Sequence, residues 1–401
     1  MSDTFFLKNA IGDRCKVCTG CGRCLREMKG LDIIKSSPLL SCLSLELKNY
    51  LYAVDIGTTT IAMVMYDKKG KPIADRTCLN PQYRFGRDVL SRIAAAEDKY
   101  KAKLMQKQCF DEIEKGFEYF DTFLPAGEKK RAIVCANTTM TLLALGKDVS
   151  SLGKAPFNVR EKGPFRTVIG GTDTMFVQSL SAFIGGDIVA GIKATGMDQK
   201  EDISLLIDLG TNAEMVLGNR DRFVTTSASA GPAFESGAGV GKYGTDLVKN
   251  LAALLESGIM DETGLLSETY FDEGVMVGDT LMTQKLIRDL QLAKAAIRTG
   301  IDLLIKAYGI GYRDVSKVYL AGGFGYYLDE AATVRIGMLP EEFLGKCTAV
   351  GNTGLTGALV IAQGCEDEEN CMPFSDNWNV ELVEAANEDT FQEKYTNNLN
   401  F

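Results

Sequence analysis

Two groups of residues near the start of the sequence could carry chemistry. The segment Cys15-Lys-Val-Cys-Thr-Gly-Cys-Gly-Arg-Cys24 repeats a thiol every three residues. Clustered thiolates bind soft metal ions or iron-sulfur clusters. Further along, Asp55-Ile-Gly-Thr-Thr-Thr60 places a carboxylate before a glycine-threonine turn. Such a turn can offer N–H groups, hydroxyl groups and a cation ligand to a phosphate chain. The first group indicates electron transfer, and the second indicates ATP binding.

The composition excludes several classes of function. The 401 residues suffice for two or three domains, and the net charge of −9 disfavours nucleic acid and anionic membrane surfaces as partners. No apolar run approaches the ~18 residues of a membrane-spanning helix. Eleven cysteines without an apolar leader predict a cytoplasmic protein with reduced thiols. Because the sequence has no histidine, metal ligation and acid-base work fall to cysteine and to carboxylates.

A hairpin must position the Asp55 turn. The apolar run from Leu51 ends at Gly57, and residues 61–66 read as a second strand, so the glycine and threonines lie at a hairpin tip. Residues 204–217 repeat the pattern around Asp208-Leu-Gly-Thr-Asn212. Two copies of one hairpin predict a duplicated α/β domain with a cleft between its halves.

Other segments complete this organisation. Residues 131–136 predict a strand that leads into Asn137, and residues 282–308 predict a long amphipathic helix. Residues 315–325 predict a strand that runs into a glycine-rich turn, and residues 350–357 begin another helix. The predicted domains are an iron-sulfur segment, a linker, two ATPase lobes and a tail: residues 1–30, 31–50, 51–200, 201–385 and 386–401.

The cysteine spacing indicates the type of cluster. Residues 18–24 match the C-x-x-C-x-x-C run of bacterial ferredoxins, with small residues where the backbone must wrap a cubane. Met28 stands where that run would place a fourth cysteine, so the missing ligand is Cys15, Cys42 or a thiolate of a second subunit. Zinc is the alternative, although zinc sites usually join two C-x-x-C pairs across a longer loop. The expected ligands of a [4Fe-4S] cluster are Cys15, Cys18, Cys21 and Cys24. The isolated cysteines are expected to be packed thiols: Cys78, Cys109, Cys135 and Cys347.

Five motifs follow one another along the chain: Asp55-x-Gly-Thr-Thr-Thr60, Ile184-Gly-Gly-Asp-Ile-Val-Ala-Gly191, Asp208-x-Gly-Thr-Asn-x-Glu214, Ala321-Gly-Gly-Phe-Gly325 and Gly351-Asn-Thr-Gly-Leu-Thr-Gly-Ala358. This ordered set resembles the nucleotide-binding motifs of the acetate kinase, sugar kinase, Hsp70 and actin superfamily. Residues 80–93, 136–141 and 229–235 resemble, more narrowly, the reductive activators of corrinoid enzymes. The resemblance covers about residues 50–385 and implies a two-lobed, duplicated RNase H-like (actin-like) ATPase.

The family resemblance also implies an activity. Its members use ATP to drive an electron from an iron-sulfur cluster onto Co(II) of a corrinoid protein in a methyltransferase system, which restores Co(I). The implied cofactors are a [4Fe-4S] cluster, ATP and Mg²⁺. The implied partners are that corrinoid protein and an unidentified low-potential electron donor, and a homodimer is one option for the assembly. Many relatives carry a [2Fe-2S] domain and a middle domain before the ATPase, whereas here we expect only a short cysteine segment.

The motif positions assign expected roles to individual residues. Asp208 would position the attacking water, and Asp55 would hold hydrated Mg²⁺. A single glycine-threonine turn can merely close a hairpin, but two copies followed by a glycine-rich turn favour phosphate binding. The residues expected to line the nucleotide site are Gly57, Thr58, Thr59, Thr60, Asn137, Asp187, Gly210, Thr211, Asn212, Glu235, Gly322, Gly323, Phe324, Gly325 and Asn352.

Two other functions remain open at this point. The first is an activator of a 2-hydroxyacyl-CoA dehydratase, which is also an actin-like ATPase with a [4Fe-4S] cluster. Those proteins share the cluster across a dimer through cysteines inside the ATPase domain, and no comparable pair flanks the motifs here. The second is a non-redox actin-like ATPase whose cysteine segment holds structural zinc. Iron and sulfide analysis separates it from the two redox functions.

Overall fold

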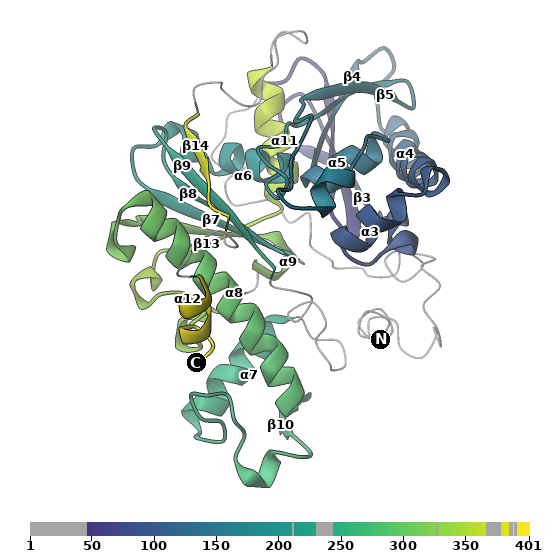
Figure 1. Cartoon of the computed structure of the whole chain (residues 1–401). Coiled ribbons are helices and arrows are strands. Elements are labelled where there is room, and N and C mark those ends of the chain that lie inside the picture. The colour runs from purple at the N-terminus through teal and green to yellow at the C-terminus, as the bar shows by residue number, and fades with distance from the viewer. Residues whose placement is uncertain are drawn as a thin grey trace. The chain divides into compact units, whose positions relative to one another are not determined.

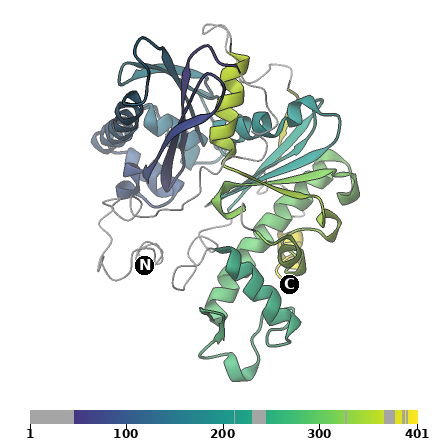
Figure 2. The same ribbon diagram turned by 180° about the vertical axis from the view of Figure 1, so that it is seen from behind.

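The computed structural model describes residues 46–210, 212–229, 244–325, 328–365, 378–384, 388 and 391–401. The expected cluster ligands Cys15, Cys18, Cys21 and Cys24 lie outside these residues, as does Cys42. The described residues form two compact units (Figures 1 and 2). The first unit contains residues 46–198 and the later segment from 351 to 378, and the second contains residues 199–350 and 379–401.

The first unit is built on a six-stranded mixed sheet with the order β3-β2-β1-β4-β6-β5. Strands β1, β2 and β3 are antiparallel neighbours, β4 runs parallel to β1, β6 runs parallel to β4, and β5 is antiparallel to β6. The strand bounds are β1 Tyr50–Ile56, β2 Thr60–Tyr66, β3 Pro72–Leu79, β4 Lys130–Ala136, β5 Phe165–Ile169 and β6 Thr172–Phe176. The hairpin and the 131–136 strand predicted from the sequence are both confirmed.

Helices cover both faces of this sheet. Side chains alternate between the faces of a strand, and Tyr52, Val54 and Ile56 pack in one core with α4, α5 and the end of α3. Leu51 and Ala53 pack in a second core with α6 and α11. The helix bounds are α3 Val89–Ala96, α4 Lys99–Asp121, α5 Thr138–Ala144, α6 Gly186–Thr195 and α11 Thr353–Gly364, with short 3-10 turns at Pro81–Phe85, Ser150–Gly153 and Met197–Gln199. Asp55 therefore lies on the face that α6 and α11 cover.

Helices α6 and α11 approach each other closely at Gly357. A Cβ atom on Gly357 would lie 2.1 Å from the carbonyl oxygen of Ala190, so only glycine fits this contact. At the C-terminal end of α11, the Arg131 side chain donates hydrogen bonds to the carbonyl oxygens of Ala362 and Cys365. These contacts fix α11 to the first unit at its middle and at its end.

The second unit repeats the sheet plan with the order β13-β12-β7-β8-β9-β14. Strands β7, β8 and β9 are antiparallel neighbours, β12 runs parallel to β7, and β14 runs parallel to β9. The bounds are β7 Ser204–Leu209, β8 Ala213–Gly218, β9 Phe223–Ala228, β12 Lys317–Ala321, β13 Cys347–Gly351 and β14 Val380–Leu382. The series β3-β2-β1-β4-β6 of the first unit corresponds to β9-β8-β7-β12-β13 here. This repetition confirms the predicted α/β class with two mixed sheets.

One long helix, α8 (Gln284–Tyr308), packs on β8 and β9 of the second unit. Thr283 caps its N-terminus, and Gly309 ends it in the left-handed conformation with φ +83°. The helix predicted over residues 282–308 is thus confirmed. The remaining elements are α7 Gly244–Glu256, β10 Val275–Val277, β11 Thr280–Met282, α9 Gly322–Gly325, α10 Glu330–Arg335 and α12 Phe391–Asn397, with 3-10 turns at Glu268–Tyr270, Tyr312–Asp314 and Glu341–Phe343.

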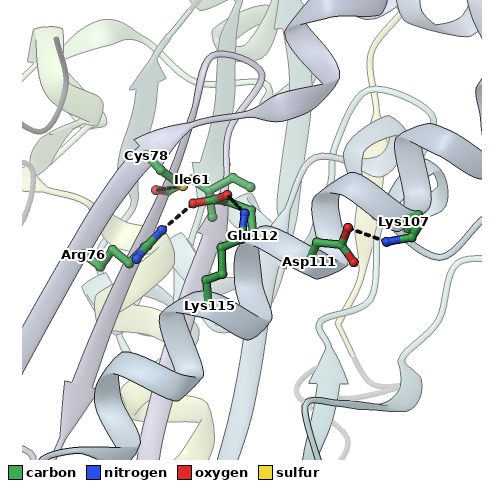
Figure 3. Close-up of polar contacts among 7 residues, drawn as sticks. All are labelled: Ile61, Arg76, Cys78, Lys107, Asp111, Glu112 and Lys115. Atoms are coloured by element: carbon green, nitrogen blue, oxygen red, sulfur yellow. Dashed lines mark hydrogen bonds and ion pairs between the residues drawn. The ribbon is translucent and has the colours of Figure 1, made fainter. Parts of the chain in front are cut away.

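Polar contacts attach α4 to the sheet of the first unit (Figure 3). Glu112 on α4 accepts from Arg76 on β3 and, at 3.1 Å, from Lys115, while the Cys78 thiol lies 3.8 Å from the carbonyl oxygen of Ile61. The four isolated cysteines are free thiols, as predicted; two are buried and two are half-buried: Cys109 and Cys135, and Cys78 and Cys347. Among the described residues, no helix has both the length and the apolar character to cross a membrane.

Candidate nucleotide site

The tip of the β1–β2 hairpin begins at Gly57. The Gly57 N–H donates to the carbonyl oxygen of Thr60 at 2.8 Å, which closes the turn. A Cβ atom on Gly57 would lie 3.0 Å from that same oxygen, so a larger residue would push the turn open. Thr58 and Thr59 follow outside the strand ladder, and Thr59 is exposed. The expected phosphate-binding residues of the first motif therefore share one short turn.

Asp55 precedes this turn and meets the N-terminus of α11. Asn352, the N-cap of α11, donates from Nδ2 to Asp55 Oδ2 at 2.6 Å, and its Oδ1 accepts from the Leu355 N–H at 2.8 Å. Burial raises the pKa of the Asp55 carboxyl to about 6, although the hydrogen bond from Asn352 acts in the opposite direction. The first and fifth motifs of the sequence thus meet at one carboxylate.

A second half-buried carboxylate lies close to Asp55. Asp187 lies in the first turn of α6, and its Oδ1 accepts from the Ile188 N–H at 2.8 Å. Its pKa is raised to about 7, mainly by burial and in smaller part by the charge of Asp55, against backbone hydrogen bonds that lower the pKa. Desolvation and these two carboxylates also raise the pKa of the Cys135 thiol, next to Asp55 on β4, well above its usual range. The buried thiol is therefore neutral, so the negative charge that can develop at this point comes from the two carboxyl groups.

Such a pair is unfavourable unless a proton or a cation compensates it. Within the part of the chain that the structure describes, no group of three or more cysteine, aspartate and glutamate side chains could hold a metal ion. A cation at Asp55 and Asp187 would therefore complete its shell with other oxygens. Mg²⁺ binds in this way, through one or two carboxylates together with water and substrate phosphates. The residues present fit Mg²⁺ bound with a nucleotide.

Asn137 joins the tip of the hairpin to α5. Its Oδ1 caps the helix by accepting from the Met140 N–H at 2.9 Å, and its Nδ2 lies 3.5 Å from Thr58 Oγ1. Gly185, at the start of α6, packs against it so closely that a Cβ atom would lie 2.4 Å from Asn137 Cα. Gly185, two residues before Asp187, is therefore required for the close approach of α6 to this end of the sheet.

The second unit places Asp208 near the end of β7, opposite Glu214 of β8. The turn that follows is closed by the Gly210 N–H, which donates to the carbonyl oxygen of Asn212 at 2.9 Å. Gly322, at the start of α9, has φ +82°, and a Cβ atom there would lie 2.5 Å from the Leu209 carbonyl oxygen and 2.8 Å from Asp208 Oδ1. The glycine-rich turn after β12 can touch Asp208 only because it has no side chain.

The expected site residues thus fall into two groups. The first unit brings together Asp55, Gly57, Thr58, Thr59, Thr60, Asn137, Asp187 and Asn352. The second brings together Asp208, Gly210, Asn212 and the α9 residues Gly322, Gly323, Phe324 and Gly325. Thr211 and Glu235 lie outside the described residues.

Sequence reasoning missed the residues that support the first group. Asn80 and Arg92 contact the tip of the hairpin, and both lie in the 80–93 segment, which was singled out without a role. Gly185 belongs to a motif of the sequence, but its close contact with Asn137 could not be predicted from that motif. Glu214 was likewise quoted, and its place opposite Asp208 could have been found by counting residues along the hairpin.

Comparison with known proteins identifies the family. The model described as "RACo middle region" matches residues 50–200, and the model described as "C-terminal domain of RACo the ASKHA domain" matches residues 202–242 and 238–401. The expectation that only a short cysteine segment precedes the ATPase domain of this family is therefore wrong, because the middle region is present.

Two curated relatives and one solved structure support the match. "Corrinoid activation enzyme RamQ" of Eubacterium limosum is 29% identical, over 88% of this chain and 70% of the relative. "[Co(II) methylated amine-specific corrinoid protein] reductase" of Methanosarcina barkeri is 24% identical, over 54% of this chain and 49% of the relative.

The solved structure "Reductive activator for corrinoid,iron-sulfur protein" superposes with a TM-score of 0.74 and 28% identity. It covers 88% of this chain, and the chain in turn covers 66% of its length. The two family models together match nearly all of the sequence from residue 50 onward. The chain belongs to the RACo family, the ATP-dependent reductive activators of corrinoid proteins.

Proposed function

We propose that this chain transfers one electron to the Co(II) corrinoid of a methyltransferase system's corrinoid protein and so restores Co(I). The names of the two curated relatives support this substrate, and the second specifies a methylated amine-specific corrinoid protein. An uphill electron transfer needs a coupled reaction that favours one state of the complex. ATP binding and hydrolysis supply that coupling, and a low-potential donor returns the electron to the activator. Such chemistry requires the reducing environment of an anaerobic cytoplasm.

The observation that carries the proposal is the pair of half-buried carboxyl groups, Asp55 and Asp187, beside the hairpin tip. Asp55 and Asp187 both have pKa values raised by burial, so a divalent cation is the group that would stabilise their charged forms. The turn at Thr58 and Thr59 offers N–H and hydroxyl groups next to them. In the proposed function, Asp55 holds hydrated Mg²⁺, Asn352 orients Asp55, and the turn binds the phosphates of ATP.

Asp208 is proposed to orient the attacking water. It occupies, in the repeated hairpin, a position near the strand end like that of Asp55, and Gly322 approaches its carboxyl group so closely that a Cβ atom there would lie 2.8 Å from Oδ1. A carboxylate in this role takes part of the proton of the water as the oxygen attacks phosphorus. Glu214, directly opposite on β8, adds a second carboxylate to the same end of the hairpin.

Cys15, Cys18, Cys21 and Cys24 are proposed to hold a [4Fe-4S] cluster. These residues lie outside the described part of the chain, so the support is their ferredoxin-like spacing and the family. A bound cluster supplies single electrons at low potential. Structural zinc in the same segment is the competing proposal.

An anaerobic assay with purified corrinoid proteins tests the function. The methylated-amine corrinoid protein is the first candidate, and formation of Co(I) is followed by its absorption spectrum with and without ATP, using a low-potential reductant. Co(I) should form only when ATP and the full-length activator are both present, and Cys21→Ser should abolish it while ATP hydrolysis continues. Stoichiometric zinc without iron, or Co(I) formation that ignores ATP, would contradict the proposal.

A further inference from the structure

The two ends of the 80–93 segment meet behind the hairpin tip. Asn80 donates from Nδ2 to the Gly57 carbonyl oxygen at 2.8 Å, and its backbone N–H donates to the Thr59 carbonyl oxygen at 2.9 Å. Arg92, on α3, donates from Nη2 to the Thr58 carbonyl oxygen. Asn80 and Arg92 together therefore donate hydrogen bonds to the carbonyl oxygens of all three residues 57–59.

This arrangement determines where the N–H groups of the turn point. In a planar trans peptide the C=O and N–H groups point in opposite directions. Because the carbonyl oxygens of Gly57 and Thr58 point toward Asn80 and Arg92, the N–H groups of Thr58 and Thr59 point away from them. Neither of these two amides donates a hydrogen bond within the described part of the chain. Successive N–H groups that share one side of a turn form an anion-binding concavity.

Arg92 is an unusual residue to find in this place. Its side chain is fully buried, with 0% exposure, and within the described residues it donates no hydrogen bond to a carboxylate. It donates from Nε to the Gly86 carbonyl oxygen at 2.9 Å and from Nη1 to Met140 Sδ at 3.1 Å. The three hydrogen-bond acceptors of the guanidinium are thus all neutral.

The guanidinium keeps its charge in this setting. Burial lowers its pKa to about 10, while Cys109, Asp88 and Tyr83 raise it, so the group is protonated at neutral pH. A buried cation without an ion-pair partner is costly, and a nearby anion offsets that cost. The turn on which Arg92 acts is the place where the proposed function puts the phosphates.

We propose that Arg92, together with Asn80, is a positioning residue that presents the amides of Thr58 and Thr59 to the nucleotide phosphates and adds positive charge behind them. Arg92 does not touch the nucleotide and acts through the Thr58 carbonyl group. The inference rests on the proposed function of the turn and goes beyond it. It also gives the 80–93 segment a role, because Asn80 and Arg92 stand near its two ends, and Asp88 caps the helix that carries Arg92.

The test uses the full-length protein with Arg92→Met, Arg92→Lys and the control Arg166→Met. Methionine fills the space but removes the charge and the donors, and Arg166 is an exposed arginine on the edge strand β5. Binding of Mg²⁺ and a non-hydrolysable ATP analogue is measured by calorimetry, and ATP hydrolysis gives KM and kcat. Arg92→Met should weaken nucleotide binding and raise KM about tenfold or more, as expected for loss of a charge-assisted hydrogen bond. The fall in kcat should be much smaller.

Arg92→Lys keeps the charge and should recover part of the affinity, whereas Arg166→Met should match the unchanged protein. Unchanged affinity in Arg92→Met would overturn the inference. So would an equal loss of kcat in both Arg92 variants without recovery of affinity by lysine, because that pattern indicates general loosening of the fold. Asp55→Asn distinguishes failure of the proposed function: if it also leaves Mg²⁺-dependent binding unchanged, the turn is not the phosphate site at all.

Discussion

The two hairpins of the molecule share a plan but differ by one residue in their turns. In the first, the last strand pair is Ile56 with Ile61, and in the second it is Leu209 with Ala213. The shorter turn shifts the residue that faces the aspartate. Asp55 is opposite Ala62, and Asp208 is opposite Glu214. The length of the turn and the residue type at the facing position together place a methyl group across from Asp55 and a carboxylate across from Asp208.

The two aspartates also differ in the groups that surround them. Both side chains are half-buried. Asp55 lies beside Asp187 and receives a hydrogen bond from Asn352, which suits a residue that holds a cation. Asp208 is instead approached by the backbone at Gly322. The comparison teaches that a duplicated hairpin can supply two roles from one motif, with cation binding proposed for the first unit and water positioning for the second.

The largest expected effect comes from Asp208→Asn. This change keeps the shape of the side chain but removes the carboxylate that is proposed to orient water. The rate of ATP hydrolysis should fall by about 100-fold or more, as is typical of positioned acid-base groups. Nucleotide affinity, measured by calorimetry, should change little. The control is Asp221→Asn, a change at an exposed aspartate of the same unit. If Asp208→Asn hydrolysed ATP at the unchanged rate, the second hairpin would not have the separate role of positioning water.

An intermediate effect is expected from the glycines that touch the two aspartates. Gly322→Ala forces a side chain into a backbone with φ +82° and to within 2.5 Å of the Leu209 carbonyl oxygen. Gly354→Ala has no such backbone strain, and its Cβ would meet only side-chain atoms, Asp55 Cγ at 3.1 Å, Asp55 Oδ1 at 3.2 Å and Asn352 Oδ1 at 3.3 Å. Strain of this kind costs on the order of 1–3 kcal/mol, so kcat/KM for ATP should fall about tenfold in Gly322→Ala and only slightly in Gly354→Ala. The melting temperature should likewise fall more in Gly322→Ala than in Gly354→Ala. A larger loss in Gly354→Ala would mean that Asp55 is the more tightly constrained of the two.

The smallest expected effect concerns pH and the carboxyl pair. Since burial raises the pKa of Asp55 to about 6 and of Asp187 to about 7, from 3.8, the folded chain binds more protons than the unfolded chain between these values. Without Mg²⁺ the free energy of unfolding should therefore fall as the pH rises from about 4 to about 7. Asp187→Asn should reduce this loss and, at pH 7.5, melt about 2–4 °C above the unchanged protein.

Mg²⁺ provides the matching measurement for that variant. It should raise the melting temperature of the unchanged protein at pH 7.5 and have less effect on Asp187→Asn. The exposed Asp173→Asn on β6 is the control and should keep the full response to Mg²⁺. If Asp187→Asn responded to pH and Mg²⁺ as the control does, the raised pKa values would have to be explained without a cation.

Local patterns were enough to predict the hairpins and the long helix. Alternating apolar residues, glycine-threonine turns and the 3.6-residue period each arise from contacts within a few positions, so they are visible in one sequence. The contact of Asn352 with Asp55 is different, because the two residues are 297 positions apart and only a motif resemblance could link them. The return of the chain to the first unit at residue 351 has no local signal either.

Arg92 could not be predicted for another reason. Arginine is usually exposed, so an arginine in a polar, charged segment indicates a solvated surface unless the fold is known. Gly86 packs closely against the first turn of α3, where a Cβ atom would lie 2.8 Å from the backbone nitrogen of Arg92, and its carbonyl oxygen accepts from the Arg92 side chain. The sequence around Asn80 likewise predicts only a turn residue. Its hydrogen bonds to the carbonyl oxygens of the hairpin depend on the tertiary structure.

The late position of α11 in the sequence affects the order in which the protein can form during translation. A ribosome that adds ~5–20 residues per second needs roughly 15 to 60 s to proceed from Asp55 to Asn352. Throughout that interval the sheet face that carries Leu51 and Ala53 has no α11 to cover it. The nascent first unit must therefore wait for α11 until residues 199–350 of the second unit have been synthesised. Cells that overproduce this protein should accordingly need chaperone capacity, and premature termination before residue 351 should yield aggregating fragments.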